Sequence, residues 1–106
     1  MSEVVVAGAD PDGLGDALEA GGAEVARAEG TANRPALEEA GIVDADVLVL
    51  TDAGLATSVT IAKDLNPDLR VVIYTRDSVP EFVKGQAGHI LDPELLSVEA
   101  VAEELV

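Results

Sequence analysis

Residues 46–75 read DVLVLTDAGLATSVTIAKDLNPDLRVVIYT and contain two apolar segments on either side of a helical pattern. Asp46–Leu50 and Arg70–Tyr74 are continuous apolar runs rich in β-branched residues, which is typical of strands buried on both faces. Four apolar residues between them recur at helical spacing: Leu55, Val59, Ala62 and Leu65. Asn66-Pro67 then ends the helix. The segment predicts a parallel β-α-β unit.

The same alternation extends in both directions. Val4–Ala7 predicts another buried strand, Glu24–Ala28 an edge strand and His89–Leu91 a very short last strand. Four more helices are expected between and after the strands. The first carries Leu14, Ala17 and Leu18 and is closed by Gly21-Gly22, and the second is Pro35–Ala40. The third begins at the capping box Ser78-Val79-Pro80-Glu81. The last is capped by Asp92-Pro93 and has an apolar stripe of Leu95, Val98, Ala102 and Leu105.

Alternating strands and helices with continuously apolar strands predict an α/β fold. We expect one domain over residues 1–106, a three-layer, Rossmann-like, doubly wound parallel sheet of about five strands in the order 2-1-3-4-5. Ligands of such sheets bind beyond the carboxyl ends of the strands, next to strand one. The loops at that edge are therefore where candidate functional residues are sought.

Composition limits the function further. The 106 residues carry 21 acidic and 6 basic side chains, a net charge of −15, which disfavours binding to nucleic acid or to an anionic membrane. No cysteine is present, so disulfides and thiolate sites are excluded. With only two lysines, this composition is typical of proteins from salt-in halophiles, where molar salt screens the repulsion. The N-terminus lacks a signal-peptide pattern, and we expect a cytoplasmic protein without membrane insertion.

The loop Gly8–Gly13 stands where a dinucleotide fingerprint would lie. Gly8 and Gly13 are spaced as its first and third glycines, whereas Asp10 replaces the second, which normally admits the pyrophosphate. Glu29, at the end of the second strand, is placed to accept hydrogen bonds from a ribose hydroxyl. The alternative is a tight strand–helix turn with an exposed acid.

Three further residues complete the candidate cofactor site: Thr51 and Asp52 after the third strand, and Arg76 after the fourth. Arg76 is the best-placed cation at this edge, although pairing with Asp77 or Asp52 would also explain it. The acids at this edge suggest either a site for a hard cation or chance proximity on an acidic surface: Asp10, Asp12, Asp52 and Asp77. His89 is the only histidine, and we assign no catalytic residue, no metal ligand and no enzymatic activity.

Asp44–Leu105 resembles the second half of the nucleotide-binding domain that regulates potassium channels and transporters, the RCK or KTN domain. The resemblance is carried by DADVLVLTD, AKDLNPDLRVVIYTRD and AGHILDPELLSVEAVAEEL, and Val4–Glu29 matches the first β-α-β unit more loosely. It implies NAD(H) or an adenine nucleotide as ligand and a transporter as partner. Asp10 departs from the family pattern, and its second helix and third strand are missing here.

Receiver domains share the strand order 2-1-3-4-5 and provide another comparison. They need clustered acids for Mg²⁺, an Asp after strand three, a Thr or Ser after strand four and a Lys after strand five. The chain offers Asp10, Asp12, Asp52 and Thr75, but Leu91-Asp92-Pro93 contains no lysine.

Three hypotheses follow. The first is a non-enzymatic regulatory or ligand-binding module with a degenerate dinucleotide site. The others are a functional NAD(H)- or nucleotide-binding subunit acting on a separate transporter, and a receiver-like phosphoacceptor domain. We also expect a homodimer through the C-terminal helix, because Leu96, Val101 and Val106 add apolar surface beside its stripe.

Overall fold

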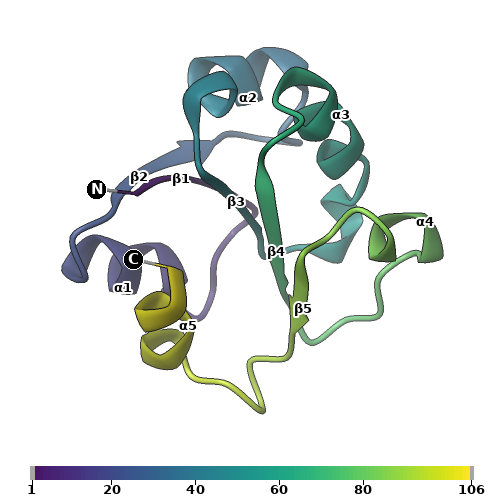
Figure 1. Cartoon of the computed structure of the whole chain (residues 1–106). Helices are drawn as coiled ribbons and strands as arrows, with labels where there is room; N and C mark the ends of the chain where they lie inside the picture. Colours follow the sequence, from purple (N-terminus) through teal and green to yellow (C-terminus); the bar gives the residue numbers. More distant parts are fainter. Residues whose placement is uncertain (1, 106) are drawn as a thin grey trace.

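The computed structural model describes residues 2–105, and its centre is a five-stranded parallel sheet in the order β2-β1-β3-β4-β5 (Figure 1). The strands are β1 (Glu3–Ala7), β2 (Glu24–Ala28), β3 (Val47–Leu50), β4 (Arg70–Tyr74) and β5 (His89–Leu91). The fold class, strand number and strand order expected from the sequence are thereby confirmed. Among residues 2–105, no helix has the length and apolarity that crossing a membrane would require.

The helices form a layer on each face of the sheet. They are α1 (Leu14–Ala20), α2 (Arg34–Glu39), α3 (Thr57–Leu65), α4 (Glu81–Lys84) and α5 (Val98–Leu105). Figure 1 shows α1 and α5 together on one side, with α2, α3 and α4 on the other. Two short 3-10 turns, Ile42–Asp44 and Ala53–Leu55, precede β3 and α3.

Two apolar cores fill the space between the sheet and these layers. In β1, Val5 and Ala7 pack toward α2 and α3, whereas Val4 and Val6 pack toward α1 and α5. Both faces of the central strands are therefore buried, which explains their uninterrupted apolar sequences.

The last helix begins later than its predicted cap. Asp92 instead closes a turn, in which its Oδ1 accepts the Glu94 N–H at 2.9 Å and its carbonyl accepts the Leu95 and Leu96 N–H groups. Ser97 caps α5 by accepting the Ala100 N–H at 3.2 Å. Leu95 thus lies outside the helix.

The buried stripe of α5 consequently differs from the predicted one. It consists of Val101, Ala102 and Leu105, with Val98 partly buried, so Val101 is not surplus apolar surface. Val106, the third residue in that expectation, lies outside the described residues.

The predicted capping box also does not form. Pro80 occupies the cap position of α4 and no side chain caps the helix, which is a single turn. Because α4 is short, Phe82 and the β5 residue Ile90 are left about half exposed.

Candidate functional site

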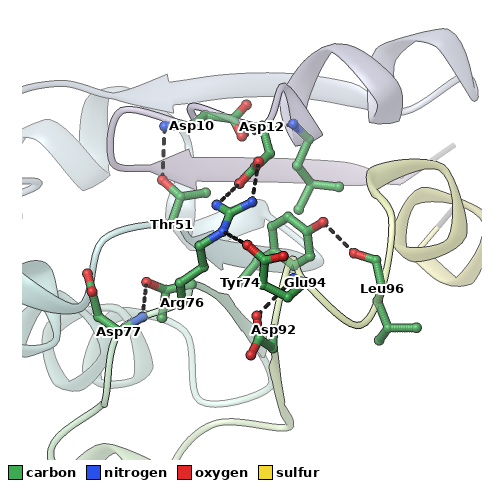
Figure 2. Close-up of polar contacts among 11 residues, drawn as sticks. Asp10, Asp12, Thr51, Tyr74, Arg76, Asp77, Asp92, Glu94 and Leu96 are labelled. Carbon is green, nitrogen blue, oxygen red and sulfur yellow. Dashed lines mark hydrogen bonds and ion pairs between the residues drawn. The ribbon is translucent and has the colours of Figure 1, made fainter.

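The loops after β1, β3, β4 and β5 meet at the carboxyl edge of the sheet (Figure 2). Thr51 joins the first two, because its hydroxyl accepts the Asp10 N–H at 3.1 Å and donates to the Ala7 carbonyl at 3.3 Å. Gly8 has a φ of +114°, and a Cβ there would collide with Thr51 Oγ1. Gly8, Asp10 and Thr51, all predicted site residues, are therefore packed together.

Asp10 is a buried structural carboxylate. Its side chain is only 3% exposed, and its two oxygens accept the N–H groups of Leu14 and Gly15, each at 2.8 Å. These N–H groups belong to the first turn of α1, where an unpaired donor would otherwise need an anion or water. Asp10 supplies that negative charge from within the chain.

The position of Asp10 changes the interpretation of the Gly8–Gly13 loop. Its carboxylate fills the place at the start of α1 where a dinucleotide pyrophosphate would lie in a Rossmann site. Arg27 of β2 approaches the same carboxylate at 3.4 Å. The loop is therefore a tight strand–helix turn, as in the alternative interpretation, but its Asp10 is buried and not exposed as that interpretation expected.

Arg76 joins two loops across the edge. Its Nη1 and Nη2 donate to the two carboxylate oxygens of Asp12 at 2.9 and 3.0 Å, and its Nε donates to Glu94 at 2.8 Å (Figure 2). The two carboxylates raise the pKa of the Arg76 guanidinium above its usual value. We call Asp12, Arg76 and Glu94 the arginine clasp.

The clasp differs from the pairing considered for Arg76 from the sequence. Arg76 forms an ion pair with neither Asp77 nor Asp52. The Asp77 N–H donates to the Thr75 hydroxyl at 3.2 Å, and Asp52 Oδ1 accepts the Gly54 N–H at 2.8 Å.

Glu94 was not among the predicted site residues, since nothing near it in the sequence indicates an arginine 18 positions earlier.

Tyr74 supports the loop that carries Glu94. Its hydroxyl donates to the Leu96 carbonyl at 2.6 Å (Figure 2). Burial, together with the negative charge of Asp12, raises the pKa of Tyr74 above 10.0. The tyrosine thus holds the 92–97 segment against β4.

The two remaining predicted site residues, Glu29 and Gly13, are not members of the clasp. Glu29 lines a shallow hollow of about 430 Å³ between β2 and α2, with Arg27 and Asn33. Gly13 adopts a φ of +74° and turns the chain into α1. Across residues 2–105, no group of three acidic, histidine or cysteine side chains is arranged to hold a metal ion.

Comparison with known proteins identifies relatives at two levels. The model of a family of unknown function, DUF7126, matches residues 4–105. No functionally curated protein matches the chain significantly.

Solved structures similar to the chain include response regulators and pilus assembly proteins. The orphan response regulator HP1043 of H. pylori has a TM-score of 0.73 at 14% identity, with 97% of this chain and 92% of that chain covered. A Burkholderia pseudomallei response regulator with a phosphorylated aspartate, calcium and citrate has a TM-score of 0.71 at 21% identity, covering 100% and 67%. A candidate pilus assembly protein (cpaE) of Burkholderia thailandensis has a TM-score of 0.68 at 18% identity, covering 99% and 95%.

These neighbours correct the family expectation. The resemblance to RCK or KTN domains is wrong, because the similar structures are receiver-like, and an NAD-binding assignment has no support from them. The receiver-like alternative agrees with them better than the degenerate dinucleotide module does. The likeness establishes a receiver-like fold.

Proposed function

The chain belongs to the DUF7126 family, and we propose that it is a non-enzymatic, receiver-like regulatory module whose carboxyl edge is held by the arginine clasp instead of being switched by phosphoryl transfer. The observation that carries the proposal is the bidentate pairing of Arg76 with Asp12. This pairing commits one of the two β1–α1 loop carboxylates, Asp10 and Asp12, that would be candidates for holding a cation.

Phosphoryl transfer to an aspartate needs a cation between the carboxylates and the phosphoryl group, and a positive charge to balance the product. Asp10 is committed to α1 and Asp12 to Arg76. After β5, where receivers carry a lysine, Asp92 adds a negative charge and binds a backbone N–H. A phosphoryl group on Asp52 would therefore lack a dedicated cation.

The clasp offers a different means of fixing the surface of the module. It ties the β1–α1 loop to the β5–α5 loop, and Tyr74 ties the second of these to β4. A partner protein would thus meet one defined loop arrangement. The use of similar folds both in response regulators and in a candidate pilus assembly protein supports a role in regulation or assembly.

The test is exposure to a phosphoryl donor. The chain is incubated with acetyl phosphate and Mg²⁺ and its intact mass is measured, with Asp52→Asn as the matched control. We expect no phosphoryl adduct on either protein. An adduct on the unaltered chain that is absent from Asp52→Asn would overturn the proposal. Asp52 after β3 would then be the phosphoacceptor, with Thr75 after β4 in the role that receivers give to a Thr or Ser.

A further inference from the structure

Arg70 differs from every other cation of the chain. Five of the six basic side chains bind a carboxylate or a backbone carbonyl: Arg27, Arg34, Lys63, Arg76 and Lys84. Arg70, exposed at the start of β4, has no such partner within residues 2–105. Among the described residues, Arg70 is therefore the basic side chain that remains available to a carboxylate of another molecule.

Arg70 stands at the rim of an apolar groove. The groove, about 420 Å³, runs between α5 and the face of β4 and β5. Its apolar lining is Val72, Leu91, Leu96, Ala100, Val101 and Leu105. It is open because β5 is a three-residue strand at the edge of the sheet. Tyr74 fixes the Leu96 end through the 2.6 Å hydrogen bond to the Leu96 carbonyl.

The two rims of the groove carry opposite charges. Arg70 and His89 lie on the strand side, and Glu103 and Glu104 lie on the helix side. Glu103 lines both this groove and a second hollow between α5 and α1, whereas Glu104 lines only this groove. Glu104 is therefore the better-placed partner for a cation that docks over the groove.

We propose that this groove is the contact surface for a second copy of the chain. A two-fold axis over the groove places Arg70 of each copy opposite Glu104 of the other. The contact then contains two equivalent Arg70–Glu104 ion pairs. Val72, Val101 and Leu105 of the lining are already buried within the chain, so the apolar surface left to cover is chiefly that of Leu96, which is 38% exposed. The proposal uses residues outside the arginine clasp and does not depend on the proposed function.

The first test is the mass in solution by light scattering or sedimentation, over the whole range of soluble concentrations. The unaltered chain is expected to dimerise, and Leu96→Glu to be monomeric with an unchanged circular dichroism spectrum. Val43→Glu is the control, because Val43 is 53% exposed and does not line the groove. A monomeric unaltered chain, or a dimer that Leu96→Glu leaves intact, overturns the proposal. If only a partner protein binds the groove, the unaltered chain is monomeric.

Charge reversal tests the orientation independently of the apolar contact. Arg70→Glu and Glu104→Arg should each raise the dimer dissociation constant about tenfold or more, because two attractive pairs become repulsive. Mixing the two single variants should restore dimerisation, since every Arg70–Glu104 pair is again of opposite charge. Single variants that dimerise normally, or a mixture that does not recover, would contradict the two-fold arrangement.

Discussion

Asp10 takes the place of an external anion at the start of α1, and through this cap it contributes to the stability of the fold. Because both carboxylate oxygens cap otherwise unpaired N–H groups, Asp10→Ala should lower the free energy of unfolding by about 1–3 kcal/mol. Chemical denaturation of both proteins measures the difference. Glu19→Ala, which removes an exposed acid from the same helix, should change it by less than about 0.5 kcal/mol. Equal stability of Asp10→Ala and the unaltered chain would show that the cap is dispensable.

Tyr74 is the only tyrosine, so its ultraviolet absorbance reports its ionisation alone. Its pKa is raised in the folded chain, which means that folding favours the neutral phenol. The associated stability is complete below about pH 10 and is lost as the pH rises through the higher folded-state pKa. We expect the absorbance titration of the folded chain to lie at higher pH than that of the unfolded chain.

Removing the phenol gives the matched variant. Tyr74→Phe should lose about 0.5–1.5 kcal/mol near neutral pH with the hydrogen bond to Leu96, and its stability should fall less steeply above pH 10. Parallel denaturation curves at neutral and alkaline pH test this. An identical alkaline decline in both proteins would exclude Tyr74 as its source.

At the scale of elements, the close contact between the β1–α1 and β3–α3 loops depends on Gly8. Gly8→Ala should destabilise the fold by about 2–4 kcal/mol, because the alanine would be strained at this positive φ and its Cβ would also collide with Thr51. Gly22→Ala is the control: its φ is +102°, but a Cβ there would meet open space. It should cost only the strain, about 1–2 kcal/mol. Equal losses would mean that the loops do not pack as described.

The elements themselves were largely predictable. Strands such as Val47–Leu50 and Arg70–Tyr74 show their burial in local sequence, and alternation with helices indicates a parallel sheet. The start of α5 was not predictable in this way, because Asp92-Pro93 resembles a helix cap while the structure uses Ser97. The local sequence is compatible with a helix start at either Asp92 or Ser97. Packing of Val98, Val101 and Leu105 against α1 and the sheet favours the start at Ser97.

The candidate site was predictable in composition but not in pairing. The strand order brings Asp10, Asp12 and Arg76 to one edge, as the sequence suggested. Which acid meets Arg76 depends on side-chain directions across loops 64 residues apart, for which a single sequence carries no signal. The burial of Asp10 depends likewise on the positive φ of 54° that turns its carboxylate toward α1.

At the scale of the whole molecule, the net charge of −15 should make stability depend on salt. Repulsion between surface carboxylates is screened in molar salt and grows as the Debye length lengthens, so the melting temperature should be lower in about 0.1 M KCl than in about 3 M KCl. Thermal unfolding followed by circular dichroism makes the comparison. Equal melting temperatures would remove the halophilic interpretation of the composition.

The central claim is that Arg76 holds the carboxyl edge in one state that phosphoryl donors do not change. Amide hydrogen exchange of residues 8–13 and 92–97 tests it most directly, in the unaltered chain with and without acetyl phosphate and Mg²⁺, in Arg76→Gln, and in Lys84→Gln as the control. We predict that the donor and Lys84→Gln leave exchange unchanged, whereas Arg76→Gln accelerates it in both segments together, because the clasp joins them. Exchange that responds to the donor, or that is unaffected by Arg76→Gln, would contradict the account.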